Sequence, residues 1–173
     1  MSRVTSIEEL SNLKSKIETE RKFTKQVLIC GGTGCISSGS NEIADKMTEK
    51  VKAAGKENEI RVIKTGCFGF CEKGPIVKML PDNTFYTEVT PEDADRLVET
   101  HLLKEEKIEE LLFVDPVTKN KISDSDHMDF YKKQERVALR NCGVIDPENI
   151  EDYLLYDGYT ALDKVLKMSQ QEV

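Results

Sequence analysis

Two pairs of cysteines, each placed directly after a short apolar run, restrict the fold of this chain more than any other feature. The members of the pairs are Cys30, Cys35, Cys67 and Cys71. The runs before them, residues 26–30 and 60–65, have the length and apolar character of buried strands. The stretch between the runs predicts an amphipathic helix, so the two strands should lie parallel, joined by a right-handed crossover. Both pairs then begin at the same edge of one sheet, where their sulfur atoms can converge.

The glycine-rich stretch CGGTGCISSGSNEI, residues 30–43, also resembles a loop that binds phosphate, but this alternative fails at defined positions. In the G-x-G-x-x-G pattern that begins at Gly32, Ser37 stands in place of the last glycine. In the Walker pattern, Ser40 stands where the lysine that binds phosphate is required. The stretch is therefore predicted to serve the cysteines, and its glycines should let the backbone approach their sulfur atoms closely.

The spacing of the pairs distinguishes several kinds of thiol site. Thiolates bind Zn²⁺ or a two-iron cluster, and gaps of four and three residues suit the wider cluster better than zinc knuckles with two intervening residues. A thioredoxin-type dithiol needs Cys-x-x-Cys, which neither pair has. His101 is predicted on the apolar side of a helix and His127 in a linker, so a Rieske-type site with two histidine ligands is not expected. Phe68 and Phe70 either shield the site from water or pack under its loop.

The rest of the pattern completes an α/β fold with a mixed sheet. The runs PIVKML and TFYTEV, joined by the turn PDN, predict an antiparallel hairpin, and Thr90 with Pro91 predicts the start of a further helix. An N-terminal helix with a capping box at Ser6 and Glu9 is expected to pack on the surface of the core. The order βα, β, ββ, α is that of a thioredoxin-like fold, here with an N-terminal helix before it and a linker plus short helices after it.

The hydrophobic periodicity changes along the chain, and these changes predict three parts. Residues 1–113 are expected to form the thioredoxin-like domain with its leading helix. Residues 114–131 show little periodicity and few apolar anchors, which predicts an extended linker. Residues 132–173 should form a separate helical segment, in which Asp146 caps a helix and Gly158 divides two short helices.

Composition argues against several classes of protein. Of the 173 residues, 38% are hydrophobic and 33% charged, which is typical of a globular protein. The net charge is −7, and no basic stripe suited to nucleic acid is present. No apolar run approaches the roughly 20 residues that span a bilayer, and the N-terminus lacks the apolar centre of a signal peptide, so a cytoplasmic location is predicted. In that compartment, five cysteines favour metal or redox chemistry over disulfides.

On this order of strands, the two cysteine pairs resemble those of the thioredoxin-like [2Fe-2S] ferredoxins. The resemblance covers residues 26 to about 113 and rests on Cys30-x4-Cys35 and Cys67-x3-Cys71. It implies that these four cysteines are the ligands of a [2Fe-2S] cluster and that the fold is thioredoxin-like.

The tail from Val137 onward resembles a second kind of segment. It is similar to the stretch before the flavin domain in NADH-binding flavoprotein subunits related to complex I, which include beta subunits of NAD(P)-dependent and electron-bifurcating [FeFe] hydrogenases. By this resemblance the chain is expected to be a fragment, with FMN, NAD(H) and [4Fe-4S] sites only in the missing remainder. Cys142 falls in this segment and is predicted to be a small buried residue or a free thiol.

Two functions follow from the sequence. The first is a one-electron carrier with no catalytic residues, which exchanges electrons with a redox partner protein or with other subunits of a hydrogenase or NADH dehydrogenase-like complex. The parent subunit would then resemble an NAD(P)H-dependent oxidoreductase, while the chain itself has no turnover. The alternative is a zinc-stabilised structural or docking module, in which the same four cysteines are purely structural.

Overall fold

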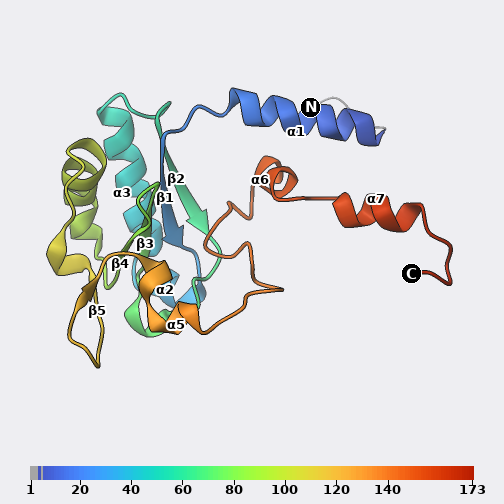
Figure 1. Ribbon diagram of the computed structural model, residues 1–173. Coiled ribbons are helices and arrows are strands. Elements are labelled where there is room, and N and C mark those ends of the chain that lie inside the picture. Colours follow the sequence, from blue (N-terminus) through green and yellow to red (C-terminus); the bar gives the residue numbers. More distant parts are fainter. Residues whose placement is uncertain (1–3, 5) are drawn as a thin grey trace. The chain divides into compact units, whose positions relative to one another are not determined.

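A computed structural model describes residue 4 and residues 6–173, which form two compact units. The smaller unit combines the described part of Met1–Lys22 with Asp146–Val173, and the larger unit is Phe23–Ile145. Figure 1 shows the elements of each unit in chain order. All five cysteines belong to the larger unit, which therefore contains the whole candidate site.

The larger unit is built on a four-stranded sheet with the order β2-β1-β3-β4. Its strands are β1 (Lys25–Cys30), β2 (Ile60–Thr65), β3 (Val77–Leu80) and β4 (Thr84–Tyr86). β1 and β2 are parallel, in a register that pairs Cys30 with Thr65. β3 runs antiparallel to β1 and forms a hairpin with β4. The predicted α/β fold class with a mixed sheet and the order βα, β, ββ, α is confirmed.

Helices cover one face of this sheet, which we call the helix face. The helical elements of the larger unit up to residue 103 are α2 (Thr33–Ser37), α3 (Ser40–Ala53), η1 (Cys71–Lys73), η2 (Pro91–Asp93), α4 (Ala94–Arg96) and the π-helical η3 (Leu97–Leu103). Of these, α3, α4 and η3 supply buried residues to the helix face. Figure 1 shows α3 alongside β1 and β2. Because strand side chains alternate between faces, Val27 and Ile29 join Met47 of α3 in one buried core. The helix start predicted at Thr90 is present as a capping box with Asp93.

Irregular segments cover the opposite face of the sheet, which we call the loop face. The remaining strand side chains, among them Leu28 and Phe85, point to this face. They pack with Phe68 from the loop after β2 and with Phe113 and Met128 from later in the chain. A second buried core therefore lies on the side of the sheet that carries the cysteines.

Residues 114–131, expected to be an extended linker, form short ordered elements in the larger unit. The elements of residues 109–132 are η4 (Glu109–Leu111), just before this region, and β5 (Phe113–Val114), β6 (Lys121–Ile122), η5 (Ser125–His127) and α5 (Asp129–Lys132). The N–H of Phe85 donates to the carbonyl of Ser123 at 2.8 Å, and Met128 has no exposed surface. The structure differs from the expectation because the few apolar residues are spaced so that they reach the loop face.

In the part of the smaller unit that the structure describes there are three helices, α1 (Ile7–Glu20), α6 (Ile150–Leu155) and α7 (Thr160–Leu166). Ser6 caps α1 as predicted, and α1 packs against α6 of the same unit. Arg21 forms an ion pair of 2.5 Å with the buried carboxylate of Asp152. α6 is capped by Asn149 rather than by the predicted Asp146, because the Asn149 side chain accepts the hydrogen bond from the first turn. Within residues 6–173, no helix is long and apolar enough to cross a membrane.

Candidate metal centre

The carboxyl ends of β1 and β2 bring the two cysteine pairs to one edge of the sheet. Cys30 ends β1 and Cys35 lies in α2, and both side chains are buried. Cys67 follows β2 and is half-buried, whereas Cys71 begins η1 and is exposed. The Sγ atoms of Cys67 and Cys71 are 3.9 Å apart. One pair is thus held in the core while the other reaches the surface.

Two glycines show how closely the sulfur atoms approach the backbone. A Cβ atom on Gly32 would lie 3.1 Å from Sγ of Cys67 and 3.5 Å from Sγ of Cys30. These two sulfur atoms come from different pairs, so the space beside Gly32 is where the pairs meet. A Cβ atom on Gly74 would lie 2.6 Å from Sγ of Cys35, which is too close for any real side chain. Glycine at both positions keeps the surroundings of the sulfur atoms open.

The thiols of the site oppose one another's ionisation. Burial raises the pKa of the Cys35 thiol to about 12, and a hydrogen bond with Cys30 and the charge of that residue act in the same direction. The pKa of Cys71 is raised chiefly by its hydrogen bond with Cys67 and then by the charge of that neighbour. Several thiolates in one place are unfavourable unless a positive charge compensates them. The donor set therefore suits a thiophilic cation or cluster, whose binding would release protons.

The loop between Cys67 and Cys71 turns a backbone donor toward sulfur. Gly69 has a φ of +80°, a conformation that glycine adopts without strain. Its N–H donates to Sγ of Cys67 at 3.2 Å. Hydrogen bonds of this kind stabilise negative charge on a thiolate, so the loop is shaped to support a charged sulfur atom.

The two aromatic residues of this loop pack on the loop face of the sheet. The ring of Phe68 meets that of Phe85 edge-on, with centroids 5.6 Å apart. The ring of Phe70 lies 5.3 Å from that of Phe113 and 4.8 Å from that of Phe130, centroid to centroid. Packing under the loop was one of the two alternatives for these residues, and the structure shows these contacts.

Sequence reasoning missed the contact between Cys142 and the loop that carries the second pair. A Cβ atom on Gly66 would lie 3.1 Å from Sγ of Cys142, so this half-buried free thiol packs against the residue directly before Cys67. No periodic pattern in residues 132–145 links them to residue 66. Within residue 4 and residues 6–173, no three Cys, His, Asp or Glu side chains gather closely enough to hold a single metal ion.

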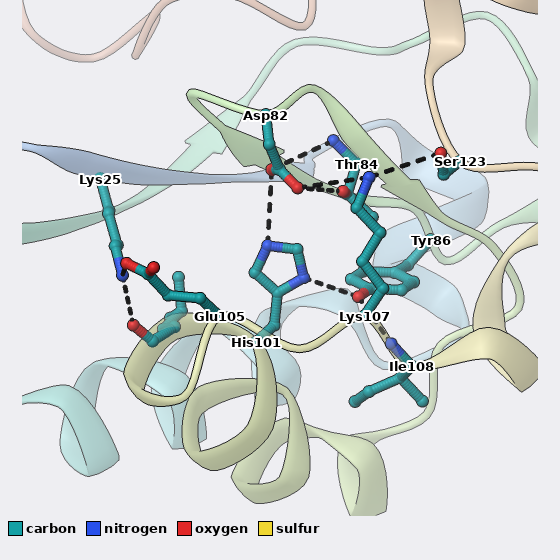
Figure 2. Close-up of polar contacts among 10 residues, drawn as sticks. Lys25, Asp82, Thr84, Tyr86, His101, Glu105, Lys107, Ile108 and Ser123 are labelled. Atoms are coloured by element: carbon teal, nitrogen blue, oxygen red, sulfur yellow. Dashed lines mark hydrogen bonds and ion pairs between the residues drawn. The ribbon is translucent and has the colours of Figure 1, made fainter.

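Both histidines have partners of other kinds. Figure 2 shows His101 between Tyr86 and Asp82 on the helix face. Nδ1 of His101 lies 2.6 Å from the Tyr86 hydroxyl, and Nε2 lies 3.4 Å from a carboxylate oxygen of Asp82. Burial lowers the pKa of His101, against the opposing effect of the Asp82 charge. The exposed His127 lies 3.2 Å from the carboxylate of Asp124.

The mixed sheet and the cysteine pairs that converge at its edge define a small α/β domain built around a thiol-rich site. The profile of a family described as thioredoxin-like [2Fe-2S] ferredoxin matches residues 3–102, and the chain belongs to this family. The matched region contains both cysteine pairs. A [2Fe-2S] cluster and iron–sulfur electron transfer are therefore the chemistry of this domain.

Several known proteins are similar to part of this chain. A 2Fe-2S ferredoxin from Clostridium pasteurianum is 36% identical over 77 residues, which are 44% of this chain and 76% of the ferredoxin. A 2Fe-2S ferredoxin from Aquifex aeolicus is 38% identical over 79 residues, 45% of this chain and 71% of the ferredoxin. A crystal structure of the thioredoxin-like [2Fe-2S] ferredoxin from Aquifex aeolicus has 31% sequence identity and a TM-score of 0.49, and covers 54% of this chain and 99% of that one.

A relative of another kind matches a short stretch. Subunit HndC of the NADP-reducing hydrogenase of Solidesulfovibrio fructosivorans is 60% identical over 42 residues. These residues are 24% of this chain and only 9% of the hydrogenase subunit.

Proposed function

We propose that this chain is a one-electron carrier in which two pairs of cysteines bind a [2Fe-2S] cluster. The ligands are Cys30, Cys35, Cys67 and Cys71. The observation that carries the proposal is the space beside Gly32, which Sγ atoms of both pairs approach, in a chain of this family. When bound, such a cluster supplies a reversible one-electron change.

Different residues of the protein would hold the cluster, expose it to a partner and stabilise its charge. Cys30 and Cys35 are buried, so they fix the site relative to the sheet. Cys71 is exposed and brings one edge of the site to the surface, where an electron partner can approach. The N–H of Gly69 supports negative charge on Cys67. Electrons therefore enter and leave on the side of the second pair.

We extend the proposal to a larger complex of the hydrogenase or NADH dehydrogenase type, which is NAD(P)H-dependent and cytoplasmic. The support is the 60% identity over 42 residues to HndC, a subunit of an NADP-reducing hydrogenase. FMN and NAD(H) would belong to the rest of such a complex, because the phosphate-loop patterns of this chain fail at Ser37 and Ser40. Any [4Fe-4S] group would belong there too, by the resemblance to the flavoprotein subunits. Residues 23–113 would be the electron carrier, residues 114–131 pack on its loop face rather than forming a linker, and residues 132–173 would include the segment that meets the other subunits.

Anaerobic purification, followed by a visible spectrum and assays of iron and acid-labile sulfide, tests the proposed function. We expect charge-transfer absorption and about two irons and two sulfides per chain. Reduction with dithionite should give the EPR signal of a one-electron couple, and the protein alone should not oxidise NADH. One zinc per chain without iron or sulfide would instead support the zinc-stabilised docking module.

A further inference from the structure

We propose that Arg136 and Tyr131 hold the loop of the second cysteine pair in the shape that aims the Gly69 N–H at Cys67, and so raise the reduction potential of the site. Both are positioning residues, and both lie beyond residues 3–102, the region that the family profile matches. The inference rests on the proposed function, because it concerns the same site.

The carbonyl of Phe68 is the group that both residues bind. A guanidinium N–H of Arg136, at Nη2, donates to this oxygen, and the hydroxyl of Tyr131 donates to it at 3.1 Å. The other terminal nitrogen, Nη1, donates to the carbonyl of Cys142 at 3.4 Å. The guanidinium also lies over the Tyr131 ring, 4.9 Å from its centroid. We call these contacts of Arg136 and Tyr131 the arginine clamp.

The clamp acts on sulfur through a single peptide group. The carbonyl of Phe68 and the N–H of Gly69 belong to the same planar trans peptide, in which the two groups point in opposite directions. Fixing the carbonyl therefore fixes the direction of the N–H. That N–H donates to Sγ of Cys67 at 3.2 Å. Arg136 thus positions a donor to sulfur although its own hydrogen bonds go to carbonyl groups.

Arg136 also places a permanent positive charge beside this peptide. Arginine stays protonated throughout the pH range of proteins, and Nη2 of Arg136 lies 3.6 Å from where a Cβ atom of Gly69 would be. Positive charge and N–H donors favour the more negative, reduced state of a thiolate-bound site over its oxidised state. Both effects of the clamp therefore raise the reduction potential.

The segment after Arg136 supports the clamp by packing against the same loop. Gly143 has a φ of +80°, and a Cβ atom there would lie 2.7 Å from the ring of Phe68. Cys142 packs against Gly66 on the other side of Cys67. The loop is thus held both before and after Cys67, which leaves the direction of the Gly69 N–H little freedom.

Four variants of the complete 173-residue chain, prepared anaerobically beside the wild type, separate the parts of the clamp. Arg136→Gln removes the charge and the forked donor, Arg136→Lys keeps the charge without the fork, and Tyr131→Phe removes only the second donor. Arg140→Gln is the matched control, because it removes the same charge from an exposed residue of the same segment. The midpoint potential is measured by stepwise reduction with dithionite, which supplies the electron and is oxidised to sulfite.

We expect Arg136→Gln to lower the equilibrium constant of reduction about tenfold, which is about 59 mV for a one-electron couple. Arg136→Lys and Tyr131→Phe should lower it by smaller factors, and Arg140→Gln should match the wild type. A potential of Arg136→Gln equal to that of Arg140→Gln would overturn the proposal.

Amide hydrogen exchange at Gly69 gives a second readout that does not require the cluster. Exchange should be about tenfold faster in Arg136→Gln than in the wild type, in both loaded and cluster-free protein, and unchanged in Arg140→Gln. If Arg136→Gln does not retain the cluster, two other measurements test the arginine clamp. These are the exchange rate of the Gly69 amide in cluster-free Arg136→Gln and the reduction potential of Tyr131→Phe. Unchanged exchange at Gly69 would refute the clamp alone, whereas a wild type without iron and sulfide would refute the proposed function.

Discussion

The two faces of the central sheet are closed by different kinds of structure. The helix face is covered by α3, α4 and η3, which pack against Val27 and Ile29 of β1. The loop face is covered by the cysteine-bearing loops and by residues 113–131, which lack regular periodicity. Met47 on the helix face and Met128 on the loop face both have no exposed surface, although more of the apolar residues on the loop face are only partly buried. Irregular structure can therefore bury an individual side chain as fully as helices do.

The difference between the faces explains why the site lies on the loop face. Inside a helix, backbone N–H groups are already bonded to carbonyl groups, so they cannot turn toward a bound group. In the loop of Cys67, the left-handed Gly69 frees an N–H for sulfur, and Gly74 leaves room beside Cys35. The helix face holds the sheet in place, and the loop face provides donors and space.

Replacing the cysteines of the loop face with serine should have the largest effect. The variants are Cys30→Ser, Cys35→Ser, Cys67→Ser and Cys71→Ser, and each should lose or severely destabilise the cluster because a serine hydroxyl is a poor ligand for iron. The measurements are iron content and the EPR signal after reduction. Cys142→Ser should keep both. An unchanged signal in any of the four, or its loss in Cys142→Ser, would contradict the ligand assignment.

Two methionine variants compare the faces directly. Met128→Ala and Met47→Ala should each lower the free energy of unfolding by about 2–5 kcal/mol, because each opens a cavity in a fully buried site. Urea unfolding of the cluster-free protein measures both values. If Met47→Ala has this cost and Met128→Ala has almost none, residues 114–131 are not held on the loop face, and the mobile linker expected from the sequence is correct.

The space around the first cysteine pair can be tested with glycine variants. Gly74→Ala should destabilise the fold by about 1–3 kcal/mol, because the new methyl group would overlap Sγ of Cys35. Gly34→Ala is the control, since apart from its chain neighbours and the backbone of its own helix no atom lies within 4 Å of its new Cβ atom, and alanine favours the helix α2. Thermal unfolding of the cluster-free variants measures the difference. Equal stability of the two variants would show that the site tolerates a side chain beside Cys35.

The smallest expected effect lies on the helix face and depends on pH. Burial lowers the pKa of His101 in the folded state, so the unfolded chain binds the proton more readily. The stability that neutral His101 contributes is complete above about 6.5, the pKa of histidine in the unfolded chain. It is lost as the pH falls toward the lower pKa of His101 in the folded state. The free energy of unfolding then changes by at most about 1.4 kcal/mol per pH unit. Urea unfolding measures this slope of unfolding free energy against pH, from about pH 7.5 to about pH 5, the range in which histidine titrates. His101→Gln should reduce the slope, and an unchanged slope in this variant would contradict the prediction.

Much of the helix face, and the edge of the sheet at which the cysteine pairs lie, could be predicted from the sequence. The short apolar run around Val27 and the crossover rule together predict Cys30 and Cys67 at one edge of the sheet. The capping box at Thr90 likewise depends on residues close in the chain. Where the sequence has no hydrophobic periodicity, the prediction was less successful. Residues 114–131 were expected to be an extended linker but form ordered elements, and the contact of Cys142 with Gly66 was not predicted.

The sequence by itself determined the two cysteine pairs, the order of the elements along the chain and the edge of the sheet at which the pairs begin, because these depend on spacing and on short-range periodicity. The tertiary structure alone decided which groups surround the sulfur atoms. Tyr131 and Arg136 reach the Phe68 carbonyl across sequence separations of 63 and 68 residues. The local sequence around a residue does not predict such contacts. The contacts form only when irregular segments pack against a face of the sheet.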